Sequence, residues 1–96
     1  MSEFVYSNEQ VKEVSYYLQY YMHQHDRQYL TADEAATILN HINTLSNEKG
    51  PKPGFNFREM LRQGKKDTIN MVTGAWQKKK HSTWYIFRVE NYDSLQ

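Results

Sequence analysis

Basic side chains dominate the second half of the chain, and phosphate neutralisation is the chemistry that they can do best. Residues 50–89 contain nine Lys and Arg residues against two acids, whereas residues 1–49 contain three bases and seven acids. The formal net charge of the whole chain is only +1. The near-neutral total therefore conceals one strongly basic region, which favours an anionic partner such as nucleic acid.

Two groups of side chains in this region can contact nucleic acid. Arg58 and Arg62 are four residues apart, so they share one face of a short predicted helix. The run Lys78–Lys80 lies at the tip of a predicted hairpin and can contact phosphates without reading sequence. The alternative for this run is a solvated turn that discourages edge pairing. The full set of candidate DNA-binding residues is Asn56, Arg58, Arg62, Gln63, Lys65, Lys66, Lys78, Lys79, Lys80 and His81.

Catalytic and metal-binding patterns find little support. The chain has no Cys, no Gly-rich phosphate loop in a strand–helix setting and no paired carboxylates on one predicted face. His23 and His25 are two residues apart, so a helix places them on different faces, where they make poor co-ligands. We therefore expect no enzyme, no cofactor and no metal site.

The N-terminal segment predicts a helix from Ser7 to about His25. Ser7 and the Gln three residues later form a capping box. The apolar residues that follow at helical spacing are Val11, Val14, Tyr17, Leu18, Tyr21 and Met22. Tyr16 and Tyr20 point away from this stripe, and they are either plain surface residues or a self-association surface.

Two further helices are predicted in the middle of the chain. A T-x-x-E box starts one at Thr31, and its apolar stripe extends over residues 35–45. An N-x-x-E box starts the other at Asn56, and Gly64 is placed to end it in a left-handed conformation. Pro and Gly residues make the 46–54 segment between them a loop.

The pattern changes to β-strand after residue 68. Runs of β-branched and aromatic residues predict strands at about 69–77 and 83–89, joined by a loop at 78–82. Trp76 and Trp84 flank the loop and can pair across the strands. Tyr85 and Phe87 alternate with Trp84 and Ile86, so both faces are largely apolar. We expect the N-terminal helix to cover the Tyr85 face, with a partner or a single-strand stacking platform as the alternatives.

These features together resemble the winged-helix DNA-binding domains of the excisionase/MerR-like group. The matching segments are the helix start LTADEAA at 30–36, the corner RQGK at 62–65 and the strand WYIFR at 84–88. Two departures are the long 46–54 loop, which leaves the angle between the central helices open, and the extra helix at 7–25.

The resemblance implies an α+β, winged-helix-like fold in which three helices precede a C-terminal β-hairpin. Residues 1–96 would form one domain, with a helix extension at 7–25 and a winged-helix-like unit at 30–90. The implied function is binding of double-stranded DNA, as an excisionase-like accessory factor or a transcription regulator. Residues 56–63 would enter the major groove, and the wing would lie on the backbone or in the minor groove. A homodimer or a cooperative oligomer on DNA is plausible, because one short helix in the major groove gives limited specificity.

A different class of function stays open beside this one. The acidic N-terminal half and its tyrosine-rich helix can form a protein-interaction module or inhibitor without DNA binding, and RNA is a third possible partner. The N-terminus lacks a signal-peptide pattern, and no apolar run has the length of a membrane span. We therefore expect a cytoplasmic protein with no membrane partner.

Overall fold

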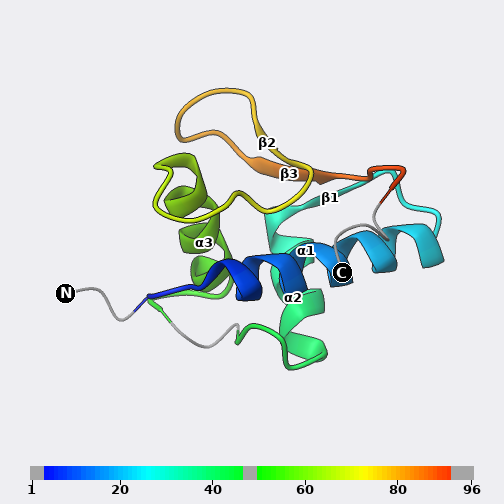
Figure 1. Ribbon diagram of the computed structural model, residues 1–96, viewed down its shortest axis with the longest axis horizontal. Helices are drawn as coiled ribbons and strands as arrows, with labels where there is room; N and C mark the ends of the chain where they lie inside the picture. Colours follow the sequence, from blue (N-terminus) through cyan, green and yellow to red (C-terminus); the bar gives the residue numbers. More distant parts are fainter. Residues whose placement is uncertain (1–3, 47–49, 92–96) are drawn as a thin grey trace.

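The described part of the chain has an α+β fold with three helices and a three-stranded antiparallel sheet. The computed structural model describes residues 4–46 and 50–91. The elements along the chain are α1 (Asn8–Gln24), β1 (Tyr29–Thr31), α2 (Ala32–His41), α3 (Phe55–Lys65), β2 (Ala75–Gln77) and β3 (Trp84–Phe87) (Figure 1). The prediction of three helices before a C-terminal hairpin is confirmed, but strand β1 between the first two helices was not predicted.

Strand β3 is the centre of the sheet, whose order is β1-β3-β2. Leu30 of β1 and Ala75 of β2 both pair with Ile86 of β3. The predicted strands were too long, because residues 69–74 precede β2 outside the sheet and β3 covers only Trp84–Phe87. The predicted pairing of the two tryptophans is also wrong, since Trp76 lies opposite Tyr85.

One hydrophobic core unites the helices with the inner face of the sheet. Its most buried large side chains include Leu18, Leu39, Phe57, Met60 and Ile86. The predicted core stripe of α1 is confirmed for its aliphatic members and is wrong for Tyr17, which is 39% exposed. The polar residues Ser15 and Gln19 are buried on this helix instead.

The helix starts depend on local side-chain hydrogen bonds, and two of the three predictions are confirmed. Ser7 caps α1 and Thr31 caps α2, each in a complete capping box. The prediction for α3 is wrong, because Gly54 precedes the helix with φ 87° and Asn56 lies within its first turn. Asn56 is buried, where its amide group donates to the Ser46 carbonyl oxygen over 3.0 Å and its side-chain oxygen accepts from the Tyr6 hydroxyl.

All three helices end in the same way, with Asp26, Asn43 and Asp67 in the left-handed region. In each case the next backbone N–H donates to the carbonyl oxygen five residues back: Arg27 to Met22, Thr44 to Leu39 and Thr68 to Gln63. This is the hydrogen bond of the Schellman motif. The prediction of Gly64 as the end of α3 is therefore wrong. Gly64 lies inside the helix, where an added Cβ would be 3.0 Å from the Met71 Cα.

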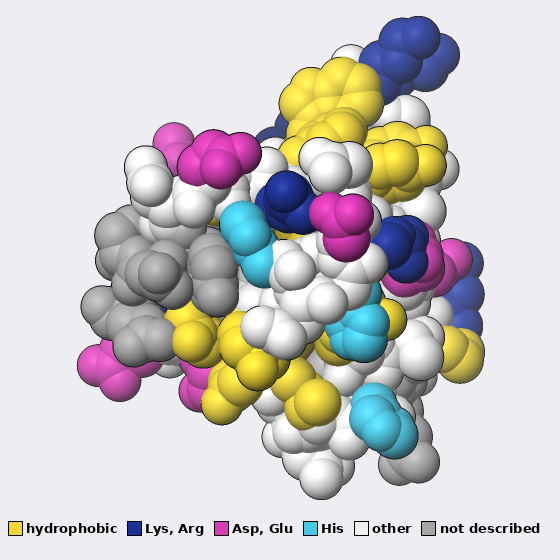
Figure 2. Space-filling view, turned by 90° about the vertical axis from the view of Figure 1, so that its right-hand side faces the viewer, with side chains coloured by type: hydrophobic (Ala, Val, Ile, Leu, Met, Phe, Trp, Pro, Cys, Tyr) yellow, Lys and Arg dark blue, Asp and Glu magenta, His cyan; other side chains and the backbone are white. Residues whose placement is uncertain are grey.

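The outer face of the sheet is aromatic and is not covered by α1, contrary to expectation. Leu30, Trp84 and Ile86 are buried on the inner face, whereas Trp76 and Phe87 are exposed on the outer face. Figure 2 shows hydrophobic side chains gathered at the top of the molecule, beside Lys and Arg side chains; the sheet lies on this side in Figure 1.

Candidate nucleic-acid interface

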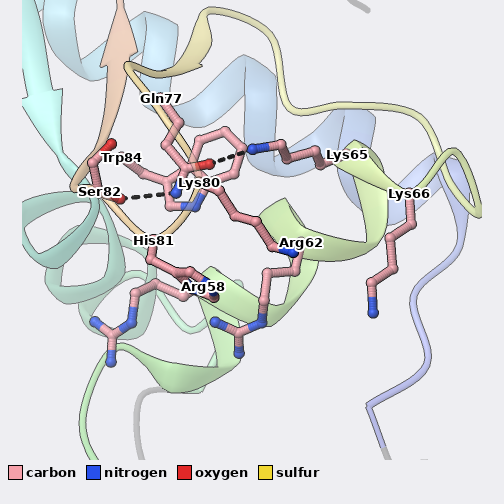
Figure 3. A pocket seen from close by; sticks show the side chains of 9 residues that line it. All are labelled: Arg58, Arg62, Lys65, Lys66, Gln77, Lys80, His81, Ser82 and Trp84. Carbon is pink, nitrogen blue, oxygen red and sulfur yellow. Dashed lines mark hydrogen bonds between the residues drawn. The ribbon is translucent and has the colours of Figure 1, made fainter.

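A basic cleft of about 550 Å³ lies between α3 and the loop that joins β2 to β3 (Figure 3). Its lining residues are Arg58, Arg62, Lys65, Lys66, Gln77, Lys80, His81, Ser82 and Trp84. Five of them are Lys or Arg, and none is acidic. Basic side chains that are up to 22 residues apart in the sequence therefore place positive charge around one hollow.

Helix α3 supplies three of the basic residues because its two faces differ in composition, and Lys66 follows at its C-cap. Phe57, Met60 and Leu61 are buried in the core. Arg58 and Arg62, four residues apart, lie on the other side and line the cleft. The sequence-derived helix face is thus confirmed, although the helix starts and ends at other residues than predicted.

Both arginines of α3 are held by acidic neighbours. Arg58 Nη1 is 2.8 Å from Asp33 Oδ1, which ties α3 to the start of α2 across the long loop. Arg62 Nε donates to Glu59 Oε1 over 2.9 Å, and its guanidinium lies 5.0 Å from the centre of the Phe55 ring. These contacts fix the arginines in position but offset part of their charge.

Lys65 joins α3 to the hairpin. Its Nζ donates to Gln77 Oε1 over 2.6 Å and lies 5.7 Å from the centre of the Trp84 ring. The ring is buried at the base of the cleft, so this amine contacts a neutral amide and an aromatic face rather than a carboxylate. Lys65 therefore keeps its net charge while it fixes the width of the cleft.

A tight turn closes the hairpin loop and directs it toward α3. The Ser82 N–H donates to the Lys79 carbonyl oxygen over 3.0 Å, and His81 between them has φ 69°. Gln77 Nε2 also donates to the Ser82 carbonyl oxygen over 2.8 Å. The turn places Lys80 and His81 on the cleft, opposite the arginines (Figure 3).

Lys66 and Lys80 carry the least compensated charge in the cleft. Within the part of the chain that the structure describes, neither lysine forms a salt bridge. Both are exposed at the rim, one on each side. An anionic group between them would gain two cationic neighbours and displace no carboxylate.

The other predicted contact residues lie outside the cleft. Asn56 is buried and bonded within the protein, so it is not on the exposed face of α3. Gln63 is half-buried and donates to the Phe4 carbonyl oxygen over 2.7 Å. Lys78 and Lys79 are exposed on the hairpin loop but do not line the cleft.

Sequence reasoning missed three residues of the cleft, namely Gln77, Ser82 and Trp84. The strand alternation already separated Trp84 from Tyr85, which is the signal that would have placed it on the α3 side. Gln77 and Ser82 hold the hairpin turn through hydrogen bonds. The turn depends on a non-glycine residue, His81, in the left-handed region, and the sequence has no clear pattern that predicts this conformation.

The tyrosines of α1 lie on a separate surface. The Tyr16 and Tyr20 rings are stacked with their centres 6.2 Å apart, and Tyr20 is 44% exposed. Tyr16 is only half-exposed, and its ring also meets that of Tyr17 at 5.7 Å. Tyr16 and Tyr20, which the sequence leaves as either plain surface residues or a self-association surface, thus form a compact cluster with Tyr17.

Residues 4–46 and 50–91 contain no group of three or more His, Cys, Asp or Glu side chains that is placed to hold a metal ion. No helix within those ranges is both long and apolar enough to cross a lipid bilayer. Comparison of the chain with protein-family models, curated proteins and solved structures gives no match.

Proposed function

We propose that the protein binds double-stranded DNA in the winged-helix manner, with α3 at the major groove and the β2–β3 loop on the backbone. The observation that carries the proposal is the basic cleft, where five Lys and Arg side chains gather with no acidic lining residue. The order of elements, with a hairpin after the paired helices α2 and α3, supports the same assignment.

The contacts differ in what they contribute. Lys66 and Lys80 neutralise phosphates on the two sides of the cleft, since neither forms a salt bridge with any acid in the described part of the chain. Arg62 reaches a guanine edge or a phosphate, because its side chain is 41% exposed and the fork geometry suits both acceptors. Arg58 chiefly holds α3 to α2 through Asp33. A protein with this interface acts as an accessory factor or a transcription regulator.

Fluorescence anisotropy with a labelled mixed-sequence duplex tests the proposal. Lys66→Ala and Lys80→Ala, measured singly, should each weaken binding. Lys12→Ala is the charge-matched control, because Lys12 is exposed on α1 outside the cleft. Folding of each variant is checked by circular dichroism. A folded wild type that does not bind at low salt would contradict the proposal, as would equal losses in all three variants.

The tyrosine cluster of α1 supports a second candidate, association with a protein partner. Tyr17 and Tyr20 are 39% and 44% exposed on one helix. Burial of such rings responds little to salt, unlike phosphate contacts. Sedimentation velocity of the wild type and Tyr20→Gln tests whether a second copy is that partner: a dimer that the substitution dissociates supports it, and a monomeric wild type excludes self-association.

A further inference from the structure

The outer face of the sheet carries four aromatic side chains that touch one another. Tyr29 comes from β1, Trp76 from β2, and Tyr85 and Phe87 from β3. The cross-strand register sets Tyr29 opposite Phe87 and Trp76 opposite Tyr85. Ring centres of neighbouring pairs are 5.7–6.2 Å apart. We call these four residues the aromatic sheet face.

The aromatic sheet face is open to solvent across the described structure. Tyr29, Trp76 and Phe87 are 45%, 47% and 41% exposed, while Leu30 and Ile86 on the opposite face are fully buried. Scattered exposed aromatics need no explanation, but four contiguous rings on a rigid strand surface form a patch of the kind that contacts a partner.

The charges around this face favour an anionic partner. None of the three strands contains an acidic residue. Strand β2 leads directly into Lys78 and Lys79, the two lysines of the loop that do not line the cleft. Lys78 follows the last residue of β2 directly and is two residues beyond Trp76, so its charge lies next to the edge of the aromatic sheet face. Figure 2 shows Lys and Arg side chains beside the hydrophobic group at the top.

The acids nearest to β1 in sequence are Asp26, Asp33 and Glu34, and all three are already paired, Asp33 with Arg58 at 2.8 Å. Arg27 Nη2 is 2.9 Å from Glu34 Oε2, and Arg88 Nη1 is 3.2 Å from Asp26 Oδ1. Their charges are therefore offset locally and oppose an anion only weakly.

A second copy of the chain fits this face less well. The exposed parts of four aromatic side chains amount to roughly 350 Å². A stable dimer buries about 800 Å² per partner. Like-charged lysines at the edge would also meet one another in a symmetric pair.

We propose that the aromatic sheet face binds single-stranded DNA, with bases stacked on the rings and phosphates near Lys78 and Lys79. Every base has a π-face, so such a platform tolerates any sequence, and flanking lysines follow the backbone. The choice of DNA over RNA rests on the proposed function, whereas the stacking surface is separate from the basic cleft. The lysine run is thus divided: Lys80 belongs to the cleft, and Lys78 and Lys79 to the aromatic sheet face.

Binding of labelled oligo-dT, which cannot form a duplex with itself, tests the proposal by fluorescence anisotropy at low salt. Trp76→Thr, which retains strand propensity, should weaken binding about five-fold or more. Trp76→Tyr keeps a stacking ring and should restore most of the affinity. Tyr20→Gln removes an exposed ring from α1 and should have no effect. If Trp76→Thr does not fold by circular dichroism, Phe87→Thr takes its place.

The same variants separate this proposal from duplex binding. Lys66→Ala should weaken the duplex complex and spare the oligo-dT complex, and Trp76→Thr should do the reverse. A folded wild type that fails to bind oligo-dT overturns the stacking proposal alone, as does equal binding by Trp76→Thr. Tighter binding of oligo-U overturns the choice of DNA. A wild-type dimer that Trp76→Thr makes monomeric assigns the face to a second copy instead.

Discussion

Gln19 is a buried polar residue that joins three backbone segments. Its Nε2 donates to the carbonyl oxygens of Phe87 and Thr73 over 2.9 and 3.4 Å, and its Oε1 accepts from the Val89 N–H over 2.9 Å. The side chain thus fixes α1 to the end of β3 and to the turn before β2. Its polar atoms are satisfied although the side chain is fully buried.

Replacement of Gln19 should test this role. Gln19→Leu has a similar volume but leaves buried backbone groups without partners, so the free energy of unfolding should fall by about 2–3 kcal/mol. Urea denaturation at neutral pH measures the change. The control is Gln24→Leu at an exposed position of the same helix. Equal effects of the two changes would contradict the bridging role.

Glu34 links stability to pH at the start of α2. The Thr31 backbone N–H and then the Arg27 guanidinium bond to the carboxylate, and together they hold its pKa below the ordinary value. The unfolded chain has the ordinary pKa. The stabilisation is therefore complete above that pKa and is lost as the pH falls through the lower, folded-state pKa.

Glu34→Gln should consequently matter at neutral pH and not in acid. The amide can still accept from the Thr31 N–H, but it loses the charge, so we expect a loss of about 0.5–1 kcal/mol at neutral pH. The difference from the wild type should shrink as the pH falls from neutral through the lowered, folded-state pKa of Glu34. Urea denaturation across this range measures it, with Glu13→Gln on the exposed face of α1 as the control. A pH-independent difference would show that charge plays no part.

At the scale of elements, one type of residue starts the helices and another type ends them. Ser7 and Thr31 accept hydrogen bonds at the starts of α1 and α2, as their sequence pattern predicts. Asp26, Asn43 and Asp67 take the left-handed position at the ends, which is more often filled by Gly. The two aspartates also lie at the negative end of the helix dipole, so their charge destabilises the ends of α1 and α3.

Asp67→Gly should therefore stabilise the protein. Glycine adopts φ near the observed 63° without strain, and the change removes an anion from the C-terminus of α3. We expect a gain of about 0.5–1 kcal/mol, measured by thermal or urea unfolding. Asp67→Ala removes the same charge but retains the left-handed strain, so it should be less stable than Asp67→Gly. Equal stability of the two variants would contradict the conformational argument.

At the scale of the whole molecule, charge is distributed unevenly along a chain whose net charge is only +1. The fold concentrates the excess further, since α3 and the hairpin loop bring five Lys and Arg side chains to one cleft. The acids Asp33 and Glu59 contact its arginines but do not line it. Association with DNA should thus depend on the local field of this cleft rather than on the net charge.

The salt dependence of duplex affinity should report the number of phosphates that the basic cleft neutralises. The logarithm of the association constant should fall linearly with the logarithm of the salt concentration, with a slope near −0.9 for each phosphate neutralised. The double variant Lys66→Ala/Lys80→Ala should therefore lower the magnitude of the slope by about 1.8. Anisotropy titrations at several salt concentrations measure it, and Lys12→Ala serves as the control. An unchanged slope would contradict the proposal that Lys66 and Lys80 contact phosphates.

Much of the candidate site could be predicted because its main ingredients are local. The spacing of Arg58 and Arg62 places them on one helix face wherever the helix begins. Alternation along β3 separates Trp84 and Ile86 from Tyr85 and Phe87. Neither inference depends on what the rest of the chain does.

The sequence by itself determined the capped helix starts of α1 and α2, the inward aliphatic stripes and the basic segment, because each follows from contacts within a few residues. Only the tertiary structure decided that Tyr29–Thr31 pairs with β3, that Asn56 is buried against Tyr6 and that the aromatic sheet face stays open. It also placed Lys80 at the cleft and left Lys78 and Lys79 outside it. These outcomes depend on neighbours 50 or more residues away in several cases, and the packing of the core selects those neighbours.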